Sequence, residues 1–142
     1  MLTVVTGPPC SGKTTYLQQR ARPDDIVIDF DAIAQALGSH VGHGHSAHIA
    51  SVAGKAWFAA VCEAIAQHHA GRRAWVIDTA PTASRRRQYE AAGARTVTCS
   101  ETPQELHARA DGNRPPSWHA RIDQWFASQG RDDPQPRPRT RW

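Results

Sequence analysis

The clearest chemistry in the sequence belongs to an eight-residue pattern, G-x-x-x-x-G-K-T, which follows a short apolar run at residues 2–6. Glycines let the backbone wrap closely round a phosphate, the lysine offers a positive charge, and the threonine hydroxyl suits Mg²⁺. The pattern therefore predicts a binding site for ATP and Mg²⁺. The residues expected to hold the nucleotide are Gly7, Pro8, Pro9, Cys10, Ser11, Gly12, Lys13, Thr14 and Thr15.

Within this pattern, Lys13 and Thr14 have the most specific expected roles. Only Lys13 and Lys55 are lysines among the 17 Lys and Arg residues, so Lys13 is not a by-product of a lysine-rich composition. We expect Lys13 to act catalytically on the β- and γ-phosphates and Thr14 to contact the metal. The alternative is a glycine-rich turn that contains a lysine by chance.

Acidic residues follow two further apolar runs of the chain. Asp29 and Asp31 come after residues 26–28, and Asp78 comes after residues 74–77. Asp31 is the candidate general base that takes a proton from an acceptor hydroxyl, and Asp29 is expected on the substrate side. Asp78 is expected to orient Mg²⁺ through water. In the alternative interpretation Asp29 and Asp31 cap a helix and Asp78 holds a turn.

Arginines supply the candidate groups that neutralise charge during phosphoryl transfer. Arg109 and Arg114 flank the segment Asp111–Asn113, whose composition suits a lid, at about residues 107–117, that closes over the phosphates. Both are expected to be catalytic, and Arg109 is also expected to bind ATP. Arg85 is a candidate substrate-binding residue. For each arginine the alternative is a solvated surface charge.

The elements that must position these groups alternate along the chain. Apolar or β-branched runs predict strands at residues 2–6, 26–28, 74–77 and 95–99. Helices are predicted at residues 13–21, 32–37, 49–69, 83–92 and 117–128. A further helix is predicted to begin at the Thr102 cap and to end at a break in residues 111–116. Strands separated by helices give a mainly parallel sheet in an α/β fold, with ligands at the carboxyl ends of the strands.

The longest predicted helix, at residues 49–69, has an apolar stripe expected to face the core. Its members are Val52, Ala56, Ala59, Ala60, Cys62, Ile65 and Ala66. Before it, residues 38–48 are rich in Gly, Ser and His and predict a loop. His43 of this loop is a candidate contact for the acceptor. The alternatives are a polar loop that orders only on binding, or adventitious transition-metal binding by its four histidines.

Composition limits the remaining possibilities. A chain of 142 residues with 39% hydrophobic residues allows one domain of ordinary size, expected at residues 1–130. Residues 131–142 are rich in Arg and Pro and predict a flexible tail, which holds part of the net charge of +4. No apolar run is expected to approach the length of about 18 residues that is needed to cross a membrane. The three cysteines are odd in number and widely spaced, so no disulfide framework is expected. A cytoplasmic location is therefore expected, and the oligomeric state is open.

The order of these parts resembles the P-loop kinase family, and most closely the kinase domain of phage polynucleotide 5'-hydroxyl kinases. The resemblance spans about residues 2–128, through GPPCSGKTT, VIDFDAIAQAL, VIDTAPTASRRRQYEAAG and TPQELHARADGNRP. It implies an adenylate-kinase-like fold of three α/β/α layers, with four to five strands and a helical lid. It also implies transfer of the γ-phosphoryl of ATP to the 5'-hydroxyl of DNA or RNA. In such kinases an acid after the second strand is the general base, which corresponds to Asp31, and lid arginines hold the phosphates, which corresponds to Arg109 and Arg114.

Other functions remain open at this stage. A small-molecule kinase could use the same parts on a nucleoside, nucleotide, sugar or antibiotic, and a modified base within DNA could also be the acceptor. A nucleotide-dependent binding or switch protein would bind ATP without transfer. A GTPase is disfavoured because Asn precedes neither lysine, so the guanine-reading N-K-x-D motif is missing. Trp118 is either a stacking platform for a nucleobase or a packing residue.

Overall fold

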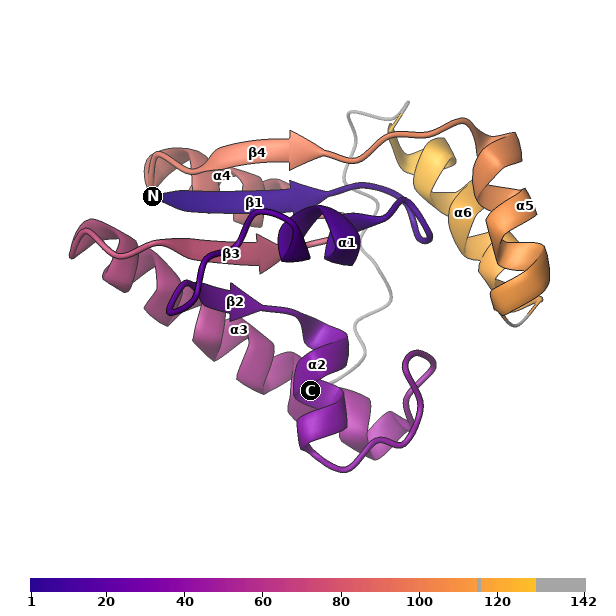
Figure 1. Cartoon of the computed structure of the whole chain (residues 1–142), viewed down its shortest axis with the longest axis horizontal. Coiled ribbons are helices and arrows are strands. Elements are labelled where there is room, and N and C mark those ends of the chain that lie inside the picture. The colour runs from indigo at the N-terminus through magenta and orange to yellow at the C-terminus, as the bar shows by residue number, and fades with distance from the viewer. Residues whose placement is uncertain (115, 130–142) are drawn as a thin grey trace.

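The computed structural model describes residues 1–114 and 116–129, so the predicted tail at residues 131–142 lies outside the described residues. Figure 1 shows strands that alternate with helices along most of the chain, as the sequence predicts. The elements are β1 (Leu2–Thr6), α1 (Lys13–Gln18), β2 (Ile26–Ile28), α2 (Phe30–Ala36), α3 (Ala47–His69), β3 (Ala74–Ile77), α4 (Ala83–Ala91), β4 (Arg95–Thr98), α5 (Pro103–Asn113) and α6 (Ser117–Gln129).

The four strands form one sheet in the order β2-β3-β1-β4, and every pair is parallel. All five residues of β1 are buried, which fits its central position and its apolar and β-branched sequence. Parallel strands end at the same edge of a sheet. The segments that follow β1, β2 and β3, which contain the predicted site residues, therefore leave the sheet from one edge.

Helices cover both faces of this sheet. On one face the side chains of Leu2, Val4 and Val76 pack with Val61 of α3 and Tyr89 of α4. On the other face Val5 and Trp75 pack with Leu17 of α1. Figure 1 shows α1 in front of the sheet, with α3 and α4 behind it. The predicted three-layer α/β/α fold with a parallel sheet is confirmed.

Helix α3 faces the sheet with a different stripe from the predicted one. Val52 is 53% exposed. Four other members of the predicted stripe, Ala56, Ala59, Cys62 and Ala66, are also exposed. The fully buried residues are Ala53, Val61 and Ala64. The helix is apolar on nearly every side, so its pattern does not distinguish the two faces, and packing against the sheet selects one.

By length and composition, α3 is also a helix that could cross a membrane, contrary to the expectation from the sequence. The helix has 23 residues, and the mean hydropathy of its most apolar window is 1.4. In the structure α3 packs against β1, β2 and β3 and against α2. Long apolar helices of this kind also form the covering layer of a parallel sheet, where one face is removed from water.

Helices α5 and α6 pack together beside the carboxyl ends of β1 and β4 (Figure 1). The predicted capping box is confirmed, because Thr102 and Glu105 cap the start of α5 reciprocally. The predicted break at residues 111–116 is wrong at its beginning, since α5 continues through Asn113. The pair Pro115-Pro116 in the sequence accounts for the later end, because a proline disfavours helical geometry in the residue before it.

Polar side chains also join α5 to α6. His107 and His119 meet through their Nδ1 atoms at 2.5 Å. The outer nitrogen of each ring contacts a carboxylate of the other helix, His107 with Asp123 at 2.9 Å and His119 with Asp111 at 3.1 Å. Leu106, Ala110 and Ile122 form the buried contact beneath them, so that the two helices form one packed unit.

One buried ion pair ties the turn before β2 to β3. Asp25 accepts hydrogen bonds from Trp75 Nε1 at 2.8 Å and from Arg73 Nε at 2.9 Å. Burial by itself would raise the pKa of Asp25, but the bonds from the Arg22 amide, Trp75 and Arg73 lower it to about 2. Because this pKa lies below the ordinary value, Asp25 stabilises the fold at neutral pH and loses this effect as the pH falls from about 4 toward 2.

We therefore expect Asp25→Asn to lower the melting temperature by several degrees at pH 7, and the difference from wild type to shrink as the pH approaches 2. Thermal unfolding followed by circular dichroism at a series of pH values measures this. Asp24→Asn is the matched control, because Asp24 is exposed and asparagine also tolerates its positive φ of 69°. An equal loss at pH 7 and pH 2 would contradict the expected role of the Asp25 charge.

Candidate functional site

The predicted phosphate-binding loop leaves β1 and is anchored at the end of β3. The Thr79 carbonyl oxygen accepts hydrogen bonds from Gly7 N at 3.3 Å and from Thr6 Oγ1 at 3.1 Å. Trp125 of α6 donates to the same oxygen through Nε1, at 2.9 Å. One carbonyl therefore holds the start of the loop and the helical pair α5–α6 in a common arrangement.

The two glycines of the pattern occupy places that other residues would fill poorly. Gly7 has a φ of 136°, and a Cβ added there would lie 2.2 Å from the Cys99 carbonyl oxygen. Gly12 has a φ of 76° and faces open space, with no atom within 4 Å of an added Cβ. Because both φ angles are positive, a side chain would be strained at either position, and at Gly7 it would also clash with the backbone.

Lys13 is buried in the loop, with 9% of its surface exposed. Its Nζ donates to the Gly7 carbonyl at 3.0 Å and to the Pro8 carbonyl at 2.6 Å. Burial lowers the pKa of Lys13 to about 8, against the opposing effect of nearby acidic groups that include Asp29 and Asp31. The group is therefore still largely charged at pH 7, at the position where the pattern places a phosphate.

Two observations test whether the loop fits a phosphate. The Ser11 hydroxyl is buried and has no hydrogen-bond partner within the part of the chain that the structure describes. Thr14 and Thr15 are exposed at the start of α1, so their hydroxyls are open to a ligand. A buried donor without a partner costs free energy that a phosphate oxygen would recover. Together with Lys13, these residues fit a bound phosphate group.

Magnesium has no ready-made cage of carboxylates here. No three His, Cys, Asp or Glu side chains converge on a possible metal position among residues 1–114 and 116–129. Mg²⁺ at nucleotide sites is commonly held by few protein groups together with phosphate oxygens and water. The exposed Thr14 hydroxyl fits that kind of coordination, and its role as a metal contact stays a prediction.

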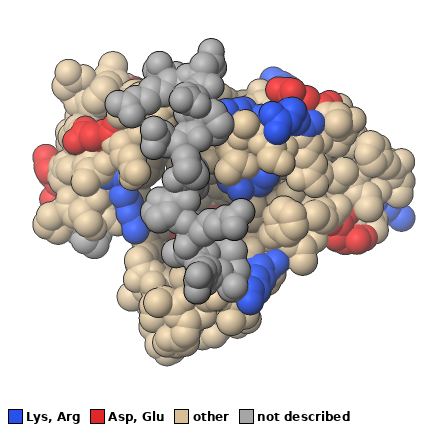
Figure 2. All heavy atoms as spheres, turned by 180° about the vertical axis from the view of Figure 1, so that it is seen from behind, with Lys and Arg blue, Asp and Glu red and all other residues tan. Residues whose placement is uncertain are grey.

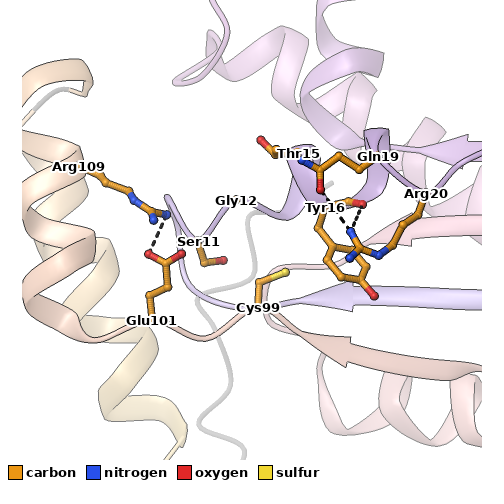
Figure 3. Close-up of a pocket in the computed structure, with 9 residues that line it drawn as sticks. All are labelled: Ser11, Gly12, Thr15, Tyr16, Gln19, Arg20, Cys99, Glu101 and Arg109. Atoms are coloured by element: carbon orange, nitrogen blue, oxygen red, sulfur yellow. Dashed lines mark hydrogen bonds and ion pairs between the residues drawn. The ribbon is translucent and has the colours of Figure 1, made fainter.

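A cavity of ≈ 430 Å³ opens beside the loop and is large enough for part of a nucleotide. Figure 3 shows its lining, which comes from the loop, α1, the segment after β4 and α5. The lining residues are Ser11, Gly12, Thr15, Tyr16, Gln19, Arg20, Cys99, Glu101 and Arg109. The Arg20 guanidinium lies 3.9 Å from the centre of the Tyr16 ring, which places a cation and an aromatic face at one wall.

Arg109 reaches this cavity from α5. Its Nη1 lies 2.7 Å from Glu101 Oε2 and donates to the Cys10 carbonyl of the loop at 3.3 Å. Glu101 was not among the predicted site residues, because nothing in its sequence context distinguishes it from a surface acid. The structure thus places Arg109 next to the loop, and its contact with ATP phosphates stays a prediction.

Arg114 lies beside Trp118 of α6. The guanidinium groups of Arg114 and Arg121 each lie 5.3 Å from the Trp118 ring centre, and the His43 ring centre lies 5.0 Å from it. Trp118 is only 9% exposed, so the structure favours packing over an open stacking platform. Of the two predicted lid arginines, Arg109 contacts the loop through the Cys10 carbonyl, and Arg114 lies beside Trp118.

Asp29 and Asp31, for which the sequence predicts different roles, have different hydrogen-bond partners. Asp29 is the N-cap of α2 and accepts a hydrogen bond from the Asp31 amide at 3.0 Å. Burial raises the pKa of Asp29 above its ordinary value. The Asp31 side chain instead meets two histidines of the following loop, with His43 Nδ1 at 2.6 Å and His45 Nε2 at 2.8 Å. Capping thus belongs to Asp29, and the Asp31 carboxylate is directed away from the helix start.

Asp78 and Arg85, for which separate roles are predicted, contact each other. Arg85 Nε donates to Asp78 Oδ2 at 2.6 Å, and Tyr89 donates its hydroxyl to the same oxygen at 3.1 Å. Arg85 also lies 5.5 Å from the Trp57 ring centre, and Asp78 is only 5% exposed. This geometry fits the alternative in which Asp78 holds the turn after β3. A metal role for Asp78 and an acceptor role for Arg85 stay predictions.

Known proteins resemble the chain in structure. No protein-family model and no curated protein matches its sequence. A chain of the Pnkp1/Rnl/Hen1 RNA repair complex matches with a TM-score of 0.64 and 15% identity over 93% of this chain, which spans 46% of that chain. A protein of Chloroflexus aurantiacus j-10-fl that is assigned as a kinase matches with a TM-score of 0.62 and 20% identity, over 87% of this chain and 73% of that one. At these identities the likeness shows the fold alone, which is an α/β fold with a parallel sheet.

Proposed function

We propose that the protein is a kinase that uses ATP and Mg²⁺ to phosphorylate a hydroxyl group. The observation that carries this proposal is the pairing of two groups at one edge of the sheet. Lys13 lies buried in the loop that follows β1, and Asp31 follows β2, whose carboxyl end lies at the same edge of the parallel sheet. A cation for the phosphates and a base for the acceptor are the two parts that phosphoryl transfer requires.

In the proposed reaction, the loop amides and Lys13 hold the β- and γ-phosphates, and Arg109 approaches them from α5. Mg²⁺, held with Thr14, would supply positive charge to the phosphate oxygens. Asp31 accepts the proton of the acceptor hydroxyl as its oxygen bonds to the γ-phosphorus. The bond from that phosphorus to the bridging oxygen breaks, and ADP leaves. Asp31 then holds one proton, which it returns to solvent.

For the acceptor, the 5'-hydroxyl of a DNA or RNA end is the leading candidate. It is supported by the resemblance of the sequence to polynucleotide kinases and by a structural neighbour that belongs to an RNA repair complex. Seen from behind (Figure 2), the uncovered part of the surface carries Lys and Arg in small separate groups. We expect a 5' end to be recognised at the carboxyl edge of the sheet, where the proposed catalytic groups lie.

A small hydroxyl-bearing substrate is the second candidate. It is favoured by the way that residues 38–46 approach Asp31, whose side chain is only 34% exposed. A loop that covers the base restricts the size of the acceptor that can reach it. Nucleosides, nucleotides, sugars and antibiotics all carry hydroxyls of suitable reactivity.

One assay distinguishes these functions. The full chain is incubated with γ-labelled ATP and Mg²⁺, together with 5'-hydroxyl DNA and RNA oligomers, the same oligomers carrying a 5'-phosphate, and a panel of nucleosides and sugars. We expect label on the 5'-hydroxyl oligomers and none on their phosphorylated counterparts. Label only on a small molecule would favour the second candidate. Tight ATP binding with no labelled product would instead indicate a binding or switch protein.

A further inference from the structure

Two histidines of the loop between α2 and α3 bind the two oxygens of one carboxylate. His45 Nε2 lies 2.8 Å from Asp31 Oδ1, and His43 Nδ1 lies 2.6 Å from Asp31 Oδ2. Each ring contacts a different oxygen, so the two contacts together fix the orientation of the Asp31 carboxylate. Every hydrogen-bonded carboxylate oxygen still has a lone pair that can accept from a further hydroxyl.

The two histidines differ in how firmly they are held. The His45 side chain is 2% exposed, its ring centre lies 5.8 Å from that of Phe30, and its Nδ1 lies 2.6 Å from Ser39 Oγ. The His43 side chain is 30% exposed and has the edge of the Trp118 ring beside it. His45 is therefore fixed at both ring nitrogens inside the protein, whereas His43 stands on the open side of Asp31.

The hydrogen-bond pattern also defines the form of His45. An ionised carboxylate only accepts hydrogen bonds, so His45 Nε2 must carry the hydrogen that it shares with Asp31. Ser39 has one hydroxyl hydrogen, for which His45 Nδ1 at 2.6 Å and the Val41 carbonyl at 3.4 Å compete. The shorter contact favours donation from Ser39 to Nδ1, which leaves the ring hydrogen of His45 on Nε2.

We propose that His45, held by Ser39, is a positioning residue that fixes the Asp31 carboxylate toward the acceptor hydroxyl. This inference rests on the proposed kinase function and on Asp31 as its base. A general base is effective only when its oxygen lies within hydrogen-bond reach of the proton that it takes. A carboxylate that is free to rotate would spend less time in that arrangement, so the loss of His45 affects the rate of transfer more than the binding of ATP.

The variants His45→Ala, His45→Gln and Ser39→Ala test this in the full chain, with kcat and the KM for ATP measured on the acceptor that wild type phosphorylates best. We expect His45→Ala to lower kcat by about 10-fold to 100-fold with little change in the KM for ATP. His45→Gln is expected to recover most of this loss, because its amide Nε2 can still donate to Asp31. Ser39→Ala is expected to give a smaller loss.

His40→Ala is the matched control, because His40 is an exposed histidine of the same loop. It is expected to keep wild-type kinetics, and thermal unfolding establishes that every variant is folded. An unchanged kcat in His45→Ala, or a His45→Gln variant as slow as His45→Ala, would overturn the inference while the kinase proposal stands. A wild-type chain that phosphorylates nothing would overturn both.

Nitrogen NMR of ring-labelled histidine supplies a readout that does not depend on activity. We expect His45 in the wild-type chain to carry its ring hydrogen on Nε2. The Nδ1–H tautomer in the wild type would contradict the arrangement, whatever the activity of the protein.

Discussion

Replacement of Lys13 with alanine is expected to lower the rate of phosphoryl transfer by about 10³-fold, the largest effect that we predict for a single residue. The lysine is the buried cation of the phosphate-binding loop, and its Nζ lies within hydrogen-bond distance of two loop carbonyls. Without it, charge that develops on the moving phosphoryl group has no positive partner on that side. Steady-state kinetics with labelled ATP and titration of ATP binding measure the two parts of this effect.

The sequence offers a matched control, since Lys55 is its only other lysine and is exposed on α3. Lys55→Ala is expected to keep wild-type kinetics. Lys13→Arg is expected to be nearly as inactive as Lys13→Ala, because a larger planar guanidinium does not fit a place with 9% exposure. Wild-type activity in Lys13→Ala would show that the loop does not perform the proposed chemistry.

Replacement of Asp31 with asparagine is expected to reduce turnover by about 10²-fold or more and to leave ATP affinity nearly unchanged. Asparagine keeps the shape of the side chain and can still accept a hydrogen bond from one of the two histidines through its amide oxygen, but it cannot take a proton at neutral pH. The kcat and the dissociation constant for ATP, measured on the same preparation, separate catalysis from binding.

Asp29→Asn is the control for this second prediction. Asp29 caps α2, and asparagine is an equally good N-cap, so the fold and the activity are both expected to persist. If Asp29→Asn abolished transfer while Asp31→Asn did not, the base would be Asp29. If neither substitution slowed the reaction, the acceptor proton would leave by another route, and the proposed mechanism would be wrong.

The sequence by itself determined the parts of this protein that depend on local patterns. The loop from Gly7 to Thr14 could be predicted because its glycines and its lysine lie within eight consecutive residues, and backbone conformation and charge at those positions depend on residue type alone. The strands were recognisable from short apolar runs, and the capping box of Thr102 and Glu105 from its spacing. The parallel α/β fold followed, because strands separated by helices have few ways to pair.

The tertiary structure decided everything that depends on which distant side chains meet. His45 is 14 positions from Asp31, and no spacing rule joins a loop histidine to a carboxylate across a helix. Arg109 meets Glu101 and the Cys10 carbonyl, and Arg114 lies beside Trp118, although none of these neighbours is indicated by spacing along the chain. The uniform apolar surface of α3 left its buried face undetermined until the sheet packed against it. Local patterns specify elements through steric and hydrogen-bond preferences, whereas site geometry arises from contacts between elements that only the folded chain brings together.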